Sequence, residues 1–247
     1  MTVVSLQQVS VTYGAHLALV DVDLRVGEGE RVALVGPSGA GKTTLLRLCN
    51  GTAVPSAGEV RLLGRQLAKC RAREVGDVRR RVGTIYQQLH LVGPLRVVHN
   101  VNSGRLGSWG ALRSLGSLLK PLEVDAARQV LSRLGIEDKL FERTDRLSGG
   151  EQQRVALARV LAQQPDLILA DEPVSSLDPA RSDEVMDLLT QVLTGLHRTL
   201  IVSLHDFDIA RRRCDRVVGL REGRVVFDVP SGDVTDRLGA DLYRITP

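Results

Sequence analysis

The stretch Gly36-Pro37-Ser38-Gly39-Ala40-Gly41-Lys42-Thr43-Thr44 organises the interpretation of the whole sequence. It fits the phosphate-binding pattern G-x-x-x-x-G-K-[ST], with Gly36, Gly41, Lys42 and Thr43 at the fixed positions. Glycines let the backbone turn tightly, so that successive N–H groups point at one phosphate chain. The lysine adds a mobile positive charge, and a threonine hydroxyl can ligate Mg²⁺.

The segments on either side of this loop supply the context that the motif requires. Arg31–Val35 is a short, mostly apolar run that predicts a buried strand. The apolar residues Leu45, Leu46 and Leu48 predict a helix that begins near Gly41 and ends at Gly51. The start of that helix would present its positive dipole end to the same anion. A strand, this loop and a helix in succession predict a site for a nucleoside triphosphate.

Composition narrows the class of protein. The 247 residues are 43% hydrophobic and 25% charged, which is typical of a soluble globular chain. We find no apolar run near the ~18–20 residues of a membrane span and no basic-then-apolar signal peptide, so we expect a cytosolic protein. The chain ends at Pro247, soon after its last expected strands, so no appended regulatory domain is expected. Any membrane role would come through a partner.

Cysteines and charge point to no special chemistry. The three cysteines are widely spaced and lack a C-x-x-C pair, so they are expected to be reduced and structural. The net charge is +4, with arginine runs at 79–81 and 211–213. We favour solvated helix faces over a nucleic-acid surface for these runs, because aromatic residues for base stacking make up only 3% of the chain.

Hydrophobic periodicity predicts an α/β organisation with a helical insert. From about residue 89 to 144 the pattern is helical, with a mobile surface loop expected between Gly104 and Gly116. After it we expect helices from Gly149 and from Pro179, the second with Asp178 as its N-cap. The expected strands cover residues 3–13, 17–35 with a break at 27–29, 59–63, 81–86, 167–170 and 200–204, and a hairpin closes the chain at 217–227.

Two carboxylates, Asp171 and Glu172, come directly after the predicted buried strand at 167–170. Ligands bind at the carboxyl ends of the strands in an open parallel sheet. Asp171 suits the Mg²⁺ shell of a bound nucleotide. Glu172 is placed to orient or deprotonate an attacking water. The alternative is an acidic cap on the following turn.

A second glycine pair opens another predicted helix. Ser148 and Glu151 have the S-x-x-E spacing of a capping box, which does not by itself require Gly149 and Gly150. Two glycines at a helix start expose backbone N–H groups to an anion. This predicts a second phosphate contact, 112 residues after the first.

Over almost its whole length the chain resembles the ATP-binding subunit of an ATP-binding-cassette (ABC) transporter. Leu147 to Arg154, Leu-Ser-Gly-Gly-Glu-Gln-Gln-Arg, resembles the signature motif of that family. The resemblance implies that Ser148, Gly149 and Gly150 contact the γ-phosphate of ATP held by a second subunit. Two cassettes would then face head to tail, with two ATPs at their interface.

The resemblance also assigns roles to single residues. Tyr13, 23 residues before Gly36, would stack on adenine. Asp171 would belong to the Mg²⁺ site and Glu172 would be the catalytic glutamate. Gln87 would sense Mg²⁺ and the membrane partner, and His205 would be the switch residue that touches the γ-phosphate. The loop at 176–178, with Asp178, would cross the dimer.

The implied fold is a P-loop NTPase core of the ABC ATPase type, with an N-terminal antiparallel β subdomain. One domain would span residues 1–247, with 1–88 and 145–247 as the core and about 89–144 as the helical subdomain.

Details of the sequence resemble the phosphonate-importer branch of the family. These details are Asn100-Val101 followed by Gly104-Arg105-Leu106-Gly107, the run from Asp171 to Asp178, and Ser203-Leu204-His205-Asp206. The resemblance implies an ATPase on the cytoplasmic face of the inner membrane, with ATP and Mg²⁺ as cofactors. Its partners would be a second copy, permease subunits and, through them, a substrate-binding protein. Arg96 and His99 depart from the residues that many importers carry in the region that meets the membrane subunit.

Three alternatives stay open. The cassette could serve an amino-acid or lipoprotein-type transporter. A soluble ABC ATPase acting on nucleic acid or ribosomes is a second possibility, but such proteins usually have two cassettes in one chain or long inserts, and no nucleic-acid partner is expected here. A simple P-loop kinase would leave Ser148 to Gly150 without a role.

Overall fold

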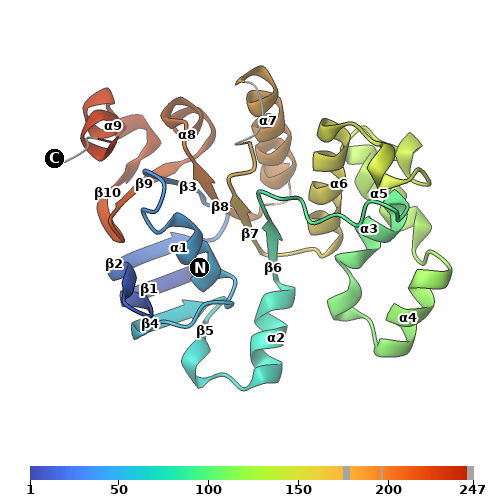
Figure 1. Cartoon of the computed structure of the whole chain (residues 1–247), viewed down its shortest axis with the longest axis horizontal. Coiled ribbons are helices and arrows are strands. Elements are labelled where there is room, and N and C mark those ends of the chain that lie inside the picture. The colour runs from blue at the N-terminus through green and yellow to red at the C-terminus, as the bar shows by residue number, and fades with distance from the viewer. Residues whose placement is uncertain (175–178, 196, 244–247) are drawn as a thin grey trace.

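The computed structural model describes residues 1–174, 179–195 and 197–243 (Figure 1). Its strands are β1 (Thr2–Tyr13), β2 (His16–Gly27), β3 (Arg31–Val35), β4 (Ala57–Leu62), β5 (Arg65–Gln66), β6 (Val82–Ile85), β7 (Leu167–Asp171), β8 (Thr199–Leu204), β9 (Arg216–Arg221) and β10 (Arg224–Pro230). Its α-helices are α1 (Lys42–Cys49), α2 (Ala72–Arg80), α3 (Val97–Ser103), α4 (Ala111–Leu119), α5 (Val124–Arg133), α6 (Gly149–Ala162), α7 (Pro179–Gly195), α8 (Phe207–Arg213) and α9 (Asp236–Tyr243).

The strands of the described ranges form two sheets. The first has the order β2-β1-β4-β5 and is antiparallel throughout. The second has the order β10-β9-β3-β8-β7-β6; its strands are parallel except for β10, which closes the sheet as a hairpin with β9. The predicted α/β class with an N-terminal antiparallel sheet and a closing hairpin is therefore confirmed.

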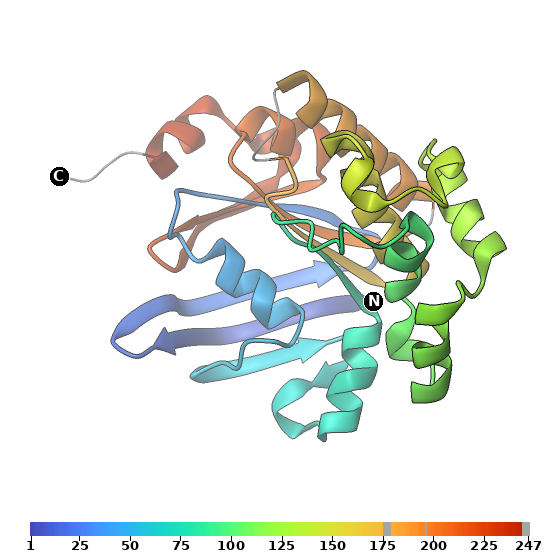
Figure 2. The ribbon, with the colours of Figure 1, turned by 45° about the vertical axis from the view of Figure 1, so that its right-hand side comes forward.

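Apolar side chains fill both faces of the parallel sheet. In β8 the side chains of Leu200, Val202 and Leu204 pack with α6 and α7 on one face, while Ile201 packs on the other. On that second face, α1 lies between the two sheets, with Leu45 buried among residues of both (Figure 2). Strands buried on both faces read as continuous apolar runs, which is why periodicity located them well.

The carboxyl ends of four parallel strands meet at one edge of the sheet. The register pairs Val35 with Leu204, Asp171 with Ser203, and Ile85 with Ala170. The phosphate loop follows β3, and the segments containing Gln87, Glu172 and His205 follow β6, β7 and β8. Segments far apart in the sequence therefore leave the sheet side by side.

The expected mobile loop between Gly104 and Gly116 was wrong over much of its length. A 3₁₀ turn covers Leu106–Ser108, and α4 begins at Ala111. The neighbouring glycines obscured the helical spacing of Leu112 and Leu115, because glycine has low helix propensity.

The basic runs lie on or directly beside helices, as predicted. Arg79 and Arg80 end α2, and the run at 211–213 lies on α8, where it pairs with Asp183, Asp187 and Asp208. The three cysteines are free thiols. Within the described ranges no helix combines the length and the apolar character needed to cross a bilayer.

Candidate functional site

The loop after β3 has a backbone that only glycine adopts easily at three positions. Gly36, Gly39 and Gly41 have φ of +151°, +80° and +103°. A Cβ on Gly36 would lie 2.1 Å from the carbonyl oxygen of Leu220 in β9, and one on Gly41 would lie 2.7 Å from that of Ala18. The backbones of β9 and β2 therefore lie so close to the loop that side chains at Gly36 and Gly41 would not fit.

Lys42 places its ammonium group inside this loop. Its Nζ donates to the carbonyl oxygens of Gly36 at 2.7 Å and Pro37 at 3.1 Å, and the side chain is only 5% exposed. Burial lowers the pKa of Lys42, while the nearby carboxylates of Glu172 and Asp171 act in the opposite direction. The amine is thus a buried cation held at the concave side of the loop, suited to contact an anion of a bound ligand.

Thr43 and Asp171 bring two oxygen groups together. The Thr43 hydroxyl lies 3.3 Å from Asp171 Oδ1. Among the described residues no cluster of three His, Cys, Asp or Glu side chains could enclose a metal ion. A hydroxyl beside one carboxylate fits Mg²⁺, because this ion takes few protein ligands and completes its octahedron with waters and phosphate oxygens.

Glu172 and His205 form a close polar pair. His205 Nε2 lies 2.5 Å from Glu172 Oε1, and the two side chains are 41% and 19% exposed. Glu172 has φ of +48°, a left-handed conformation that costs about 1–3 kcal/mol and persists only when surrounding contacts enforce it. Residues with such an unfavourable backbone conformation are common at active sites and ligand-binding sites.

Ser203 contacts the carboxylate of Asp171 and the backbone of Glu172, and sequence reasoning gave it no role in the site. Its buried hydroxyl donates to Asp171 Oδ1 at 2.8 Å and accepts from the backbone N–H of Glu172 at 2.8 Å. The contact depends on the parallel pairing of β7 with β8, which sets Asp171 opposite Ser203. The sequence signals were a polar residue within the apolar run at 200–204 and its place two residues before His205.

A cavity of about 240 Å³ opens beside the loop. Its lining joins Tyr13 and Glu172 to the loop residues Ser38, Gly39, Ala40, Gly41, Lys42, Thr43 and Thr44. Tyr13 stands at the end of β1 and is 47% exposed, so it is not a core aromatic. An exposed ring on one side and a buried ammonium on the other match the two ends of a nucleotide.

The other predicted residues lie apart from this cavity. Ser148 caps α6 through the predicted capping box: its N–H donates to Glu151 Oε2 at 2.8 Å. Gly149 and Gly150 are exposed, and a Cβ on either would meet nothing within 4 Å. Gln87 is exposed two residues beyond β6, at the same sheet edge as Asp171. The predicted residues at 175–178, Asp178 among them, lie outside the described residues.

Comparison with known proteins identifies the family. The family model described as ABC transporter matches residues 19–175, more than half of the chain. The chain belongs to the ABC transporter family. ATP-binding proteins of this family hydrolyse ATP to power transport, so the predicted enzyme class and the use of a nucleotide are confirmed.

Curated relatives narrow the similarity further. The chain is 49% identical over 231 residues to the phosphonates import ATP-binding protein PhnC of Anaeromyxobacter dehalogenans (strain 2CP-C), covering 94% of this chain but only 46% of that relative. It is 47% identical over 234 residues to PhnC of Pseudomonas putida (strain KT2440), covering 95% and 87% of the two chains. These identities confirm the predicted resemblance of the sequence to phosphonate-importer ATP-binding proteins.

Solved structures support the fold. The chain matches cbiO1 from Clostridium perfringens, part of the ABC transporter complex cbiONQ, with a TM-score of 0.82 and 26% identity over 98% of this chain and 95% of that one. It matches the dimeric ABC transporter cassette MJ0796 with a TM-score of 0.78 and 31% identity over 92% and 98%. The predicted ABC ATPase fold is confirmed.

Proposed function

We propose that this chain is the ATP-hydrolysing, energy-coupling subunit of an importer for phosphonates or a related oxyanion. The observation that carries the catalytic part is the meeting of Asp171, Glu172 and His205 with the phosphate loop at one sheet edge. Two of these groups contact each other, and Asp171 contacts Thr43.

Each predicted residue has a task in this proposal. Gly36 to Thr44 hold the phosphates through backbone N–H groups and Lys42, and Tyr13 stacks on adenine. Oxygen atoms of Thr43, Asp171 and Gln87 would hold Mg²⁺, which would neutralise phosphate charge when bound.

Glu172 is the base that orients and deprotonates the attacking water, and His205 holds the glutamate in place. The 2.5 Å contact between their side chains supports this division of work. Ser203 supports it further, because it fixes the backbone of Glu172 from the strand that leads to His205.

A second copy completes the site. Gly149 and Gly150 begin a capped helix, are exposed, and line no part of the cavity at the loop. In Figure 1, α6 lies on the far side of β6 and β7 from α1. Helix N–H groups in that position suit an anion bound to another subunit, in a head-to-tail homodimer that Asp178 would also bridge. A solved relative is a dimeric cassette, which supports this arrangement.

The substrate and the membrane partners rest on similarity. Relatives at 44–49% identity carry the name phosphonates import ATP-binding protein. We propose that permease subunits hold this chain at the cytoplasmic face of the inner membrane, and that a binding protein delivers the substrate to them. We also propose the division into a core of 1–88 and 145–247 and a helical subdomain of about 89–144.

Two measurements test the proposal. Glu172→Gln should keep ATP binding but lower ATP turnover about 10²–10⁴-fold, the range expected for loss of a general base; turnover equal to wild type would refute its role. Reconstituted with its permease, the wild-type chain should hydrolyse ATP faster when a phosphonate-loaded binding protein is added. Stimulation by an amino-acid-loaded binding protein instead would favour the amino-acid alternative.

A further inference from the structure

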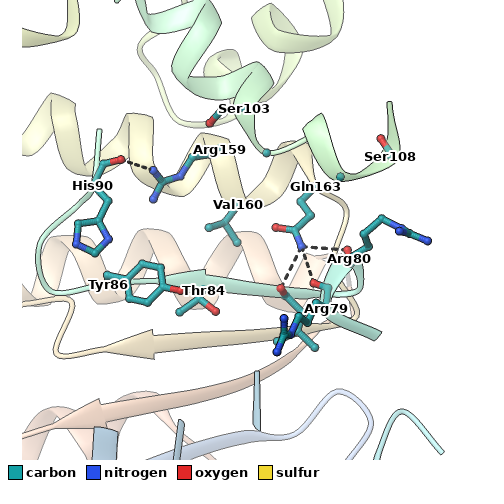
Figure 3. A pocket seen from close by; sticks show the side chains of 13 residues that line it. Arg79, Arg80, Thr84, Tyr86, His90, Ser103, Ser108, Arg159, Val160 and Gln163 are labelled. Carbon is teal, nitrogen blue, oxygen red and sulfur yellow. Dashed lines mark hydrogen bonds between the residues drawn. The ribbon is translucent and has the colours of Figure 1, made fainter. Parts of the chain in front are cut away.

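Helix α6 begins at the signature residues and runs along a second cavity, of about 420 Å³ (Figure 3). Thr84 and Tyr86 at β6 line one side of this cavity, and Ser103 at the end of α3 lines the other. Two polar side chains face it: Arg159 of α6 and Gln163, which directly follows the helix. Neither was singled out by the sequence motifs.

Gln163 fixes α6 to the beginning of β6. Its Nε2 lies 3.2, 3.0 and 3.0 Å from the carbonyl oxygens of Arg79, Arg80 and Val82. These carbonyls end α2 and start β6, where the strand is held in the sheet by pairing with β7. This contact anchors α6 to the rigid part of the fold.

Arg159 fixes α6 to the segment beyond the other end of β6. Its Nη1 donates to the carbonyl oxygen of His90 at 2.8 Å, and its Nη2 to that of Leu89 at 2.9 Å. Arg159 makes no ion pair within the part of the chain that the structure describes. Burial lowers the pKa of its guanidinium, and Tyr86 acts in the opposite direction. A partly buried charge here has two backbone carbonyls as its polar partners, so these bonds are charge-assisted.

The segment held by Arg159 has an unfavourable backbone. His90 has φ of +50°, in the left-handed region that a residue with a side chain adopts only when its surroundings enforce it. Its ring lies against Tyr86, with centroids 4.9 Å apart. Gln87 lies in the chain between these two rings. The contact between Tyr86 and His90 closes a short loop that contains Gln87, and Arg159 holds the end of this loop through Leu89 and His90.

We propose that Arg159 is a positioning residue that ties the segment Tyr86–His90, and with it Gln87, to the helix that carries Ser148, Gly149 and Gly150. The inference deepens the proposed function, on which it rests, by naming a connection between two predicted parts of the site. The N-terminus of α6, Gly149, lies ten residues before Arg159, or roughly 15 Å along a regular helix. Arg159 therefore joins the Gln87 segment directly to the helix that begins with the signature glycines.

Arginine suits this role better than lysine. Its planar fork bonds two successive carbonyls at once, whereas an ammonium is a single point of charge on a flexible stem. The contacts of Arg159 show a physical connection between the two segments. A functional connection requires a measured effect of Arg159 on the Gln87 segment and on ATP hydrolysis.

The experiment compares full-length wild type with Arg159→Gln, Arg159→Lys and the matched control Gln163→Leu. The control removes amide contacts from the same helix and cavity but leaves Leu89 and His90 bonded. Hydrogen–deuterium exchange of backbone amides at residues 87–92 reports the tie, and kcat and KM for ATP report the chemistry.

Arg159→Gln should speed exchange at residues 87–92 about tenfold, the effect expected for loss of a charge-assisted hydrogen bond. It should lower kcat by a similar factor with KM within twofold of wild type, because the loop that holds ATP is untouched. Arg159→Lys should recover part of both losses. Gln163→Leu should lower the melting temperature but leave exchange at 87–92 and kcat near wild type.

Three results would overturn the inference: unchanged exchange in Arg159→Gln, faster exchange with unchanged kcat, or equal effects in Arg159→Gln and Gln163→Leu. Absence of ATPase activity in the wild-type chain would contradict the proposed function instead. In that case the exchange comparison alone would decide the positioning role.

Discussion

Replacing Ser203 by alanine removes a buried hydroxyl that touches both acidic residues of the site. The hydroxyl donates to Asp171 at 2.8 Å and accepts from the Glu172 N–H at 2.8 Å. In Ser203→Ala the left-handed backbone at Glu172 loses this contact, and Asp171 loses an orienting partner. We expect Glu172 to relax away from His205 and catalysis to suffer.

The size of the effect follows from the two bonds. A hydrogen bond to a charged group contributes about 1.5–3 kcal/mol, and a buried N–H left without its partner costs about 1–3 kcal/mol. We therefore expect the free energy of unfolding to fall by about 1–3 kcal/mol. If the bond to the carboxylate is needed in the transition state, its loss lowers kcat by roughly 10- to 150-fold.

Thr199→Val is a matched control on the same strand. Thr199 is also fully buried, and its hydroxyl accepts from the Gly29 N–H at 3.0 Å and lies 3.4 Å from the Gly27 carbonyl. Urea unfolding should show a comparable loss of stability in both variants. ATPase assays at saturating ATP and Mg²⁺ should show lowered kcat only in Ser203→Ala. Wild-type kcat in Ser203→Ala, or equal losses in both variants, would refute the reasoning.

Other perturbations test other parts of the site. Gly36→Ala should unfold more easily than Gly39→Ala by about 1–3 kcal/mol in urea titrations, because both positions have positive φ but only the first meets a backbone oxygen at 2.1 Å; equal stabilities would contradict this. Lys42→Ala should weaken ATP binding at least ~10-fold in a fluorescence titration, through loss of a charge-assisted contact; unchanged affinity would count against it. The backbone N–H and hydroxyl of Ser148 hold the pKa of Glu151 below its ordinary value of 4.5. Its contribution to stability should therefore be present above pH 4.5 and be lost as the pH falls through the lowered pKa, so the stability difference between wild type and Glu151→Gln should shrink in acid; a difference that grows in acid would be evidence against this cap.

Structural features that depend on neighbouring residues or on a regular apolar spacing could be predicted from the sequence. The strand, loop and helix around Lys42, the buried strand before Asp171 and the capping box at Ser148 are set by neighbouring residues, so pattern and residue type sufficed. The first half of α4 was assigned to a loop because Gly110 and Gly116 flank Leu112 and Leu115, whereas its end lies in the stretch that was predicted to be helical.

Contacts between distant segments could not be read from the sequence. The bond between Ser203 and Asp171 depends on strand order and register, which span 32 residues of chain. The hydrogen bonds from Arg159 to Leu89 and His90 join segments about 70 residues apart. Their acceptors are backbone carbonyls, which every residue has, so no residue type in the sequence indicates them. Side chain–backbone contacts of this kind become visible only once the fold is known.

The central claim is that the ATP site is completed by a second copy of the chain, and cysteine cross-linking tests it directly. Ser38→Cys and Ser148→Cys would be made separately in a Glu172→Gln, Cys70→Ser background, since Cys70 is the partly exposed native thiol. A disulfide requires Cα atoms within about 7 Å. Under mild oxidation, a cross-linked dimer should form only when both variants are mixed and ATP is present. No cross-link in that mixture, or equal cross-linking by either variant alone, would contradict it.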